Sequence, residues 1–421
     1  MRMIINVLIF LIGISLYASY GIPGFLYLAA ATIISYGAGL LTQKQRWFSW
    51  VSIILNVLML TMVKLQPFTE WSILAPMGIS YFTLQIISYN VDVYRGKYPA
   101  ERNLFRYAFY VTYIPHLFLG PIERYDAMEP VLRKRRITWD GVFAGCTRVL
   151  WGLFKKMIIA TRIGVIVSTI SGDTGAYSGA YALVAMLLYS IQLYNDFSGG
   201  IDIVLGVSRM LGISMSENFD TPYLSQSFQE FWRRWHITLG SWLRDYVYIP
   251  LGGNRKGKIR KVCNVIITFL VSGLWHGTQY ILWGVANGVF VACGTRLQTR
   301  SKTLNRVGTF LLVSLLWSFF IWPNMFTAVK MMTSVFTTFN YGAFFATIGT
   351  LGLTLGDWIV LFVALLLLWG YDLHTERIRN FFSKLAPAGK LAVIGGLALV
   401  VMVFGMYGIG FNSEAFIYSK F

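Results

Sequence analysis

Residues 262–294 read VCNVIITFLVSGLWHGTQYILWGVANGVFVACG, two apolar arms joined by the polar turn SGLWHGTQ. As helices the arms, 262–274 and 279–294, would span roughly 20 and 24 Å at about 1.5 Å per residue. Both are short for a hydrocarbon core that is about 30 Å thick. Basic loops at 255–261 and 296–306 flank the segment. Because basic loops favour the cytoplasmic side, the chain is predicted to enter the membrane here and return to the same side.

The composition of the whole chain predicts a polytopic membrane protein. Of 421 residues, 56% are hydrophobic and 13% charged, whereas soluble domains carry roughly 25% charged residues. The same figures exclude intrinsic disorder, and three cysteines cannot frame a disulfide scaffold. The net charge of +18 lies in short basic segments between apolar runs. That arrangement is the positive-inside pattern and not that of a nucleic-acid-binding domain.

The apolar runs define the predicted fold. Runs that could cross the membrane are 4–20, 24–41, 47–65, 71–89, 105–120, 142–170, 179–198, 308–322, 357–371 and 391–411. Shorter or interrupted runs lie at 201–213, 231–250, 262–274, 279–294 and 328–353. The predicted fold is all-α and multi-pass, with about eleven transmembrane helices plus re-entrant or interfacial helices. Since no repeat, low-complexity tract or soluble domain is visible, residues 1–421 are predicted to form a single integral-membrane domain.

Each of the four histidines has its own setting. His276 lies at the apex of the turn between the two short arms. A broken helix at membrane depth needs protein or a water-filled cavity to satisfy its backbone, so His276 is predicted to line a cavity. A functional role is favoured there, and the alternative is a neutral histidine that packs the turn. His116 is predicted to pack at an interface, and His374, in a charged loop, to be solvated.

The segment FQEFWRRWHITLGSWLRDYVYIPLGGNRKG, residues 228–257, contains His236. It reads as an interfacial amphipathic helix, in which Trp232 and His236 share one face. Packing and a cavity-facing role for His236 are both open. The basic stretch 252–261 could hold phosphates of a donor, but it lacks the Ser or Thr of a P-loop. A plain positive-inside loop is the simpler interpretation.

Acidic residues stand out in YSIQLYNDFSGGIDIVLG, residues 189–206. Asp196 could orient a histidine, pair with an arginine or bind a hydroxylated substrate. Gly199 and Gly200 are predicted to break or bend the helix between Asp196 and Asp202. The sequence has no HExxH, paired CxxC or GxSxG motif. Neither a metal site nor a serine-hydrolase triad is therefore predicted.

Together these motifs resemble the membrane-bound O-acyltransferase family, and most closely its bacterial alginate O-acetyltransferase branch. The residues that carry the resemblance, in the order of the family, are PHLFLGPIERY (115–125), DFSGGIDIVLGVSRMLGI (196–213), ENFDTPYLSQSFQEFW (217–232), WRRWHITLGSWLRDYVYIPLGGNRKG (232–257), SGLWHG (272–277) and the tail FIYSKF (416–421). The resemblance covers about residues 70–295 plus the tail. The set is specific, although any one of these motifs alone would be weak.

The resemblance implies a helical bundle around a central tunnel in the bacterial cytoplasmic (inner) membrane. The family passes an acyl group from a cytoplasmic donor to a hydroxyl at the other membrane face. Its two functional histidines fall on His236 and His276, here the expected catalytic residues. His116 departs from the family pattern and inherits no role. Gly200 replaces a bulkier residue, which bears on the shape of the tunnel.

The expected chemistry is O-acetylation of an extracytoplasmic polysaccharide. Acetyl-CoA is the expected donor substrate, with no bound cofactor. The acetyl group would reach the glycan directly, or through a periplasmic or surface acyltransferase or a polysaccharide synthase complex. His276 is expected to take the proton of the attacking hydroxyl, while His236 orients the acyl group or stabilises negative charge. The candidate substrate-binding residues are Asp196, Ser198, Trp232, Trp275, Arg244 and Asp245.

Two further points of the mechanism and function follow. No Ser or Cys nucleophile is evident beside His276, which favours direct transfer over a relay through an acyl-enzyme. One alternative function is transfer of a D-alanyl group from a carrier protein to teichoic acid. The other is a non-enzymatic polysaccharide or acyl transporter, although no transporter-like internal repeat is visible. Membrane lipids are expected partners and nucleic acids are not.

Overall fold

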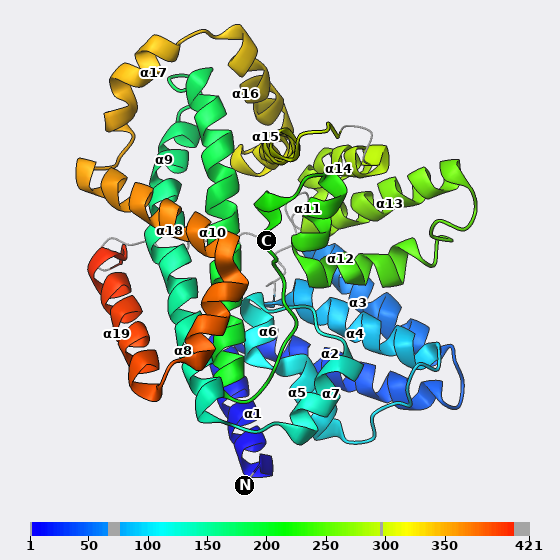
Figure 1. The fold of residues 1–421 in the computed structure, drawn as a ribbon. Coiled ribbons are helices and arrows are strands. Elements are labelled where there is room, and N and C mark those ends of the chain that lie inside the picture. Colours follow the sequence, from blue (N-terminus) through cyan, green and yellow to red (C-terminus); the bar gives the residue numbers. More distant parts are fainter. Residues whose placement is uncertain (1, 66–75, 295–297, 408–421) are drawn as a thin grey trace.

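The computed structural model describes residues 2–65, 76–294 and 298–407, and its elements there are helices (Figure 1). The tail motif 416–421 lies outside these residues. The helices are α1 (Arg2–Ser19), α2 (Ile22–Thr42), α3 (Phe48–Leu65), α4 (Ile79–Tyr94), α5 (Leu104–Thr112), α6 (Ile114–Leu119), α7 (Tyr125–Lys134), α8 (Trp139–Leu153), α9 (Thr161–Gly172), α10 (Ala180–Met210), α11 (Phe228–Arg234), α12 (Ile237–Leu243), α13 (Lys258–His276), α14 (Ile281–Cys293), α15 (Lys302–Ile321), α16 (Met325–Thr337), α17 (Tyr341–Thr347), α18 (Leu355–Lys384) and α19 (Pro387–Phe404). Two π-helical turns, η2 (Phe154–Ala160) and η4 (Arg244–Tyr248), follow α8 and α12 without a break. The predicted all-α class is confirmed for the described chain.

Among the described residues, fewer helices have the length and apolar composition of a membrane span than the crossings predicted from the sequence. Among the described residues five helices are long and apolar enough to cross a membrane, namely α2, α3, α15, α18 and α19. The run 105–120 is divided into α5 and α6, because Tyr113 is extended between them. The run 142–170 forms one continuous helix through η2, but it carries Lys155, Lys156 and Arg162. The count of about eleven crossings and the central tunnel remain predictions.

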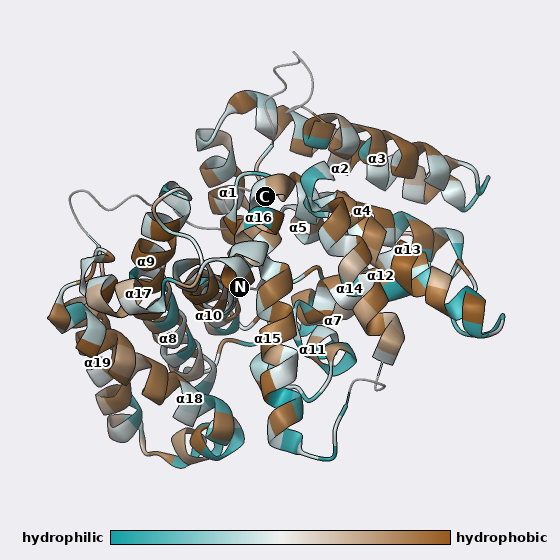
Figure 2. Ribbon diagram, turned by 90° about the horizontal axis from the view of Figure 1, so that it is seen from above, coloured by the Kyte–Doolittle hydropathy of each residue, from teal (hydrophilic) through white to brown (hydrophobic). Residues whose placement is uncertain are grey.

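The helices pack around two large apolar cores. The first core is formed by α1, α2 and α4–α7, and the second by α8–α11 and α14–α19 with the residues between them. Helices α13 and α14 lie side by side near α2–α4, whereas α8, α10, α18 and α19 form the opposite side of the molecule (Figure 1). Apolar residues recur along α3, α13 and α19 (Figure 2). Many of them are exposed, as expected for surfaces that face lipid.

Helix α10 does not break at Gly199 and Gly200, so that prediction is wrong. It runs unbroken for 31 residues from Ala180 to Met210. Gly199 instead lets α10 approach α8, since a Cβ added to Gly199 would lie 2.7 Å from the carbonyl oxygen of Gly152 in α8. Small residues allow such close approach of membrane helices. A Cβ on Gly200 would lie 2.1 Å from Leu119 Cδ2, so the bulkier residue of the family pattern would not fit here unless Leu119 moved.

The predicted helix–turn–helix at 262–294 is present, but its first arm is longer than expected. Helix α13 begins at Lys258, within the basic loop, and its 19 residues span about 28 Å. The turn follows His276 at Gly277, whose φ of 149° favours glycine. The arms pack closely because a Cβ on Gly284 of α14 would lie 2.5 Å from the carbonyl oxygen of Phe269. His276 is thereby held at the end of a rigid helical hairpin.

Candidate active site

The two predicted catalytic histidines face the same cavity. This cavity has a volume of about 20 Å³, enough for one or two water molecules. Its walls come from α10, α11, α12, α13, α14 and α15 and are mainly aromatic. The lining residues are Leu193, Trp232, Trp235, His236, Leu239, Ser272, His276, Trp283, Trp317 and Phe320. Segments that are distant in sequence therefore bring His236 and His276 together, as the sequence predicted.

His276 is the last residue of α13 and is surrounded by aromatic rings. Its ring centroid lies 4.7 Å from that of Trp275, 5.4 Å from Trp283 and 5.8 Å from Phe320. All three are edge-to-face contacts, with interplanar angles of 74°, 87° and 86°. Such contacts fix the plane of the imidazole and exclude water from its surroundings. The geometry suits a base that must meet its substrate in one orientation.

His236 lies between α11 and α12 in an unusual backbone conformation. Its φ and ψ are 45° and 53°, in the left-handed region that few non-glycine residues adopt. The side chain is only 3% exposed and contacts the ring of Phe197 at 5.0 Å. Neither of its ring nitrogens has a hydrogen-bond partner among the described residues. Because buried polar atoms are normally paired, these two nitrogens are suited to a ligand in the cavity.

Two of the predicted substrate-binding residues are tryptophans beside the histidines. Trp232 lines the cavity, and its indole nitrogen donates to Asn287 Oδ1 at 3.1 Å, which fixes its ring. Trp275 contacts both histidines, with ring centroids 6.4 Å from His236 and 4.7 Å from His276. Its indole N–H has no acceptor within the described ranges. Trp232 is placed where it could contact an acyl group, whereas Trp275 packs beside the histidines without lining the cavity.

Ser272 lines the cavity as well, and sequence reasoning missed it. It lies on α13 one turn before His276 and is buried. Ser272 shares this cavity with His276, and the interpretation that no serine nucleophile acts beside His276 stays a prediction. The i, i+4 spacing on one helix could have revealed this neighbour, because residues four apart share a helix face. Its hydroxyl is a second polar group that could contact a bound acyl group.

Asp196 and Ser198 do not line the cavity. The carboxylate of Asp196 forms an ion pair with Lys156, rather than with an arginine or a histidine. Lys155 Nζ donates to Ser198 Oγ at 2.8 Å and also pairs with Asp202. Both lysines belong to the π-helical turn η2, so these contacts join α8 and α9 to α10. The structure places these two predicted residues in a charged network between helices.

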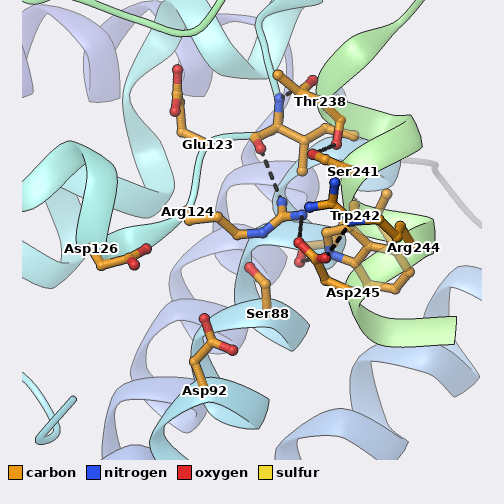
Figure 3. Close-up of polar contacts among 12 residues, drawn as sticks. Ser88, Asp92, Glu123, Arg124, Asp126, Thr238, Ser241, Trp242, Arg244 and Asp245 are labelled. Carbon is orange, nitrogen blue, oxygen red and sulfur yellow. Dashed lines mark hydrogen bonds and ion pairs between the residues drawn. The ribbon is translucent and has the colours of Figure 1, made fainter. Parts of the chain in front are cut away.

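Arg244 and Asp245 lie in the π-helical turn η4 and do not line the cavity either. Arg244 Nε lies 2.8 Å from Asp245 Oδ1, and Arg124 reaches the other oxygen of Asp245 at 3.8 Å (Figure 3). Arg95 donates to the backbone oxygen of Asp245 at 3.3 Å. Arg95 and Arg124 also stack on the ring of Tyr246, at 5.4 and 5.0 Å. This cluster ties η4 to the end of α4 and to the loop before α7.

The two remaining histidines stand apart from the cavity. His116 is completely buried on α6, and its Nδ1 lies 3.0 Å from Gln85 Nε2. His374 is exposed, as predicted, at a kink within α18 where its φ is −125°. Within the described ranges no three His, Cys, Asp or Glu side chains gather in a way that could hold a metal ion.

The structure is an all-helical membrane protein in which two histidines face one aromatic cavity. This arrangement suits an enzyme that transfers acyl groups in a site shielded from bulk water. The comparison with protein families agrees, since residues 99–338 match the MBOAT, membrane-bound O-acyltransferase family. The chain belongs to this family and is an O-acyltransferase.

Named relatives include three kinds of enzyme. A probable alginate O-acetylase AlgI of Pseudomonas fluorescens is 39% identical, over 79% of this chain and 70% of its own. A peptidoglycan O-acetyltransferase of Helicobacter pylori is 32% identical, over 63% of this chain and 57% of its own. A teichoic acid D-alanyltransferase of Bacillus subtilis is 27% identical, over 68% of this chain and 80% of its own.

Proposed function

We propose that this protein moves an acetyl group from a cytoplasmic thioester, acetyl-CoA, across the bacterial cytoplasmic membrane to a hydroxyl of an extracytoplasmic polysaccharide. The acceptor is the glycan itself or a partner acyltransferase that passes the group on. The observation that carries the proposal is the position of His236. It is buried, its ring nitrogens have no partner among the described residues, and it shares a cavity with His276.

The cavity supports a small, neutral acyl group. Its volume of about 20 Å³ favours acetyl over a long acyl chain. None of the lining residues carries a carboxylate that could pair with the ammonium of a D-alanyl group. The relatives of higher identity are also named as O-acetylating enzymes. These observations favour acetyl transfer over the D-alanyl alternative.

The proposed reaction is a direct transfer. His276 accepts the proton of the acceptor hydroxyl while its oxygen attacks the thioester carbonyl. The new ester C–O bond forms, the C–S bond breaks, and His276 returns the proton to the departing thiolate. His236 donates a hydrogen bond to the oxygen that becomes negatively charged. The aromatic walls keep bulk water away from the thioester, which water would otherwise hydrolyse.

The test measures transfer of radiolabelled acetyl from acetyl-CoA by the purified wild type and by His236→Ala and His276→Ala. Each histidine variant is expected to lose about 10²–10⁴-fold in rate. His374→Ala is the matched control, because this histidine is exposed and remote from the cavity. Its rate should equal that of the wild type, and expression should be normal in all variants.

Full activity of His276→Ala would contradict the proposal. Should the wild type not use acetyl-CoA when supplied with candidate glycans and a partner, the D-alanyl carrier protein is the next donor to test. Transport without chemistry gains support only when that donor fails too.

A further inference from the structure

The backbone of His236 is held by a segment that the proposed reaction does not use. His236 is the N-cap residue of α12, but its side chain makes no capping hydrogen bond. The first N–H groups of a helix need acceptors from outside the helix. The cap side chain usually supplies one, and histidine is not among the residues that do this well. Helix α12 therefore requires an acceptor from elsewhere in the chain.

Asn218 supplies these acceptors. Its backbone oxygen accepts from Ile237 N at 3.0 Å. Its side-chain Oδ1 accepts from Thr238 N at 3.0 Å and from Thr238 Oγ1 at 2.7 Å. Asn218 is 0% exposed, so no water competes for these bonds. A residue that lies 20 positions before Thr238 thus takes the place of the helix cap.

A short antiparallel pairing fixes this arrangement on the other side of His236. Phe219 pairs with Trp235 as an isolated bridge, and Asp220 N donates to Arg234 O at 3.0 Å. His236 is therefore bracketed by bonds to residues 218–220, one set before it and one after it. The left-handed conformation is unfavourable for a residue with a side chain and persists only where neighbouring contacts determine it.

We propose that Asn218 is a positioning residue for the acyl transfer, acting as an external N-cap of α12. By capping α12 in place of His236, it leaves the imidazole directed to the cavity and holds its backbone in the left-handed conformation. This inference rests on the proposed function of His236. It gives a chemical role to the motif ENFDTPY (217–223), which the active site otherwise does not use.

The variants compare removal of the acceptor with its retention. Asn218→Ala removes Oδ1 and is expected to lower kcat about ten- to hundred-fold with little change in the KM of the donor. Asn218→Asp keeps an oxygen at the same place, and Asp caps helices as well as Asn does. Because its buried carboxylate lowers stability, kcat is compared per folded molecule and should stay within about fivefold of the wild type. A loss of kcat in Asn218→Asp as large as that in Asn218→Ala would overturn the proposal. Where Asn218→Ala does not fold, a loss of kcat in Asn218→Asp of about tenfold or more per folded molecule would overturn it.

Asn264→Ala is the matched control. Asn264 is likewise 0% exposed, and its side chain donates to the backbone oxygens of Leu251 and Gly253 at 3.3 and 2.9 Å, away from the cavity. This variant should lose thermal stability while its kcat remains that of the wild type. An equal loss of kcat in the Asn218 and Asn264 variants would mean that removing any buried asparagine side chain has this effect. That result would contradict a specific role for Asn218.

A second variant separates positioning from general damage. In the His236→Ala background, Asn218→Ala should cause no further loss of rate, because its effect passes through the missing imidazole. An equal further loss in that background would overturn the proposal.

The positioning can also be measured without turnover. In an experimental structure of Asn218→Ala, the φ of His236 should leave the left-handed region, and an unchanged φ would contradict the inference. A wild type inactive with every donor would refute the proposed function but leave this structural test in place.

Discussion

Two regions of the molecule hold buried polar groups whose hydrogen bonds and charges are satisfied in different ways. Between η2 and α10, each charged side chain faces an opposite charge: Lys156 pairs with Asp196, and Lys155 with Asp202. Around the cavity, neither ring nitrogen of His236 has a hydrogen-bond partner among the described residues. Both regions are buried, so solvent does not explain the difference.

The contrast distinguishes charged groups that hold helices together from polar groups that are open to a substrate. A buried charge is costly unless it is paired, and pairing leaves it no capacity for a substrate. A buried histidine without a partner is tolerated as a neutral group, and its nitrogens stay open to a ligand. We infer that the charged network holds α8, η2 and α10 together, while the cavity performs the reaction. The predictions below test this division.

The largest effect is expected in the network. Asp202→Asn removes the charge that faces Lys155 and Arg148, whose Nε lies 2.9 Å from Asp202 Oδ1. Removing one member of a buried ion pair costs about 3–5 kcal/mol, because the other charge stays buried. Thermal or denaturant unfolding in detergent should show this loss, with little change in the transfer rate per folded molecule.

Asp126→Ala is the control for this prediction. Asp126 pairs with Lys97 at 2.8 Å on the surface, and such pairs contribute about 0–1 kcal/mol. The division between the regions would break if Asp202→Asn kept its stability and lost acyl transfer instead.

The sequence was sufficient for the all-α class of fold, and it also singled out the two histidines that line one cavity. His276 could be placed in a cavity because glycines and a polar turn interrupt two short apolar arms. The ion pairs of Asp196 and Asp202 could also have been found, since their partners Lys156 and Lys155 lie in an otherwise apolar run and need opposite charges. The continuity of α10 could not, because Gly199 is determined by contact with α8 and not by its own helix propensity.

The external cap of α12 shows the limit of sequence reasoning most clearly. Asn218 and Thr238 are 20 residues apart, and neither composition nor periodicity predicts that their side chains meet. Arg244 and Asp245 are candidate substrate-binding residues in the sequence, but they do not line the cavity. The chain continues beyond α12 into η4, which carries them to the Arg124 cluster instead.

The next largest loss of stability is expected at the close contact between α8 and α10. Gly152→Ala would place a Cβ 2.5 Å from the carbonyl oxygen of Gly199, so α8 and α10 must separate. Such overpacking costs about 1–3 kcal/mol. Unfolding of the variant should show the loss, with transfer by the remaining folded protein close to normal.

Gly370→Ala provides the opposite case on α18. No atom lies within 4 Å of a Cβ added at Gly370. Alanine favours the helix by about 1 kcal/mol over glycine, so this variant should be as stable as the wild type or more so. If both substitutions had the same effect, the close contact between α8 and α10 would not be what Gly152 provides.

A smaller effect is expected from Ser272→Ala in the cavity. Under direct transfer, the hydroxyl only contacts the bound acyl group, so its loss should reduce kcat less than tenfold, which is below about 1.4 kcal/mol. Ser314→Ala is the control, since Ser314 is buried and bonds Ser190 at 2.8 Å outside the cavity. A loss in Ser272→Ala as large as that in His276→Ala would instead favour a relay through an acyl-serine.

The smallest effect belongs to an ion pair with one exposed member, Asp140, which contrasts with the buried network. Lys390 Nζ lies 2.7 Å from Asp140 Oδ1, before the apolar runs of α8 and α19. The hydrogen bond and charge of Lys390 lower the pKa of the exposed Asp140 carboxyl. A lowered pKa in the folded state means that the pair stabilises the protein above the ordinary aspartate pKa of about 3.9. That stabilisation disappears as the pH falls through the lowered value.

Asp140→Asn should therefore lower the Tm slightly at pH 7, and this difference should shrink as the pH falls below the ordinary aspartate pKa of about 3.9. Added salt should also reduce the difference at pH 7, because the charge of Asp140 is exposed and screened. The deficit of Asp202→Asn should persist in the same salt, since a buried pair is screened much less. Melting curves of the two variants at low and high salt measure this directly. If salt removed both deficits, the charged network at η2 would be accessible to ions. Its charges would then not be buried, and the contrast between paired charges and the unpaired histidine would no longer compare two buried regions.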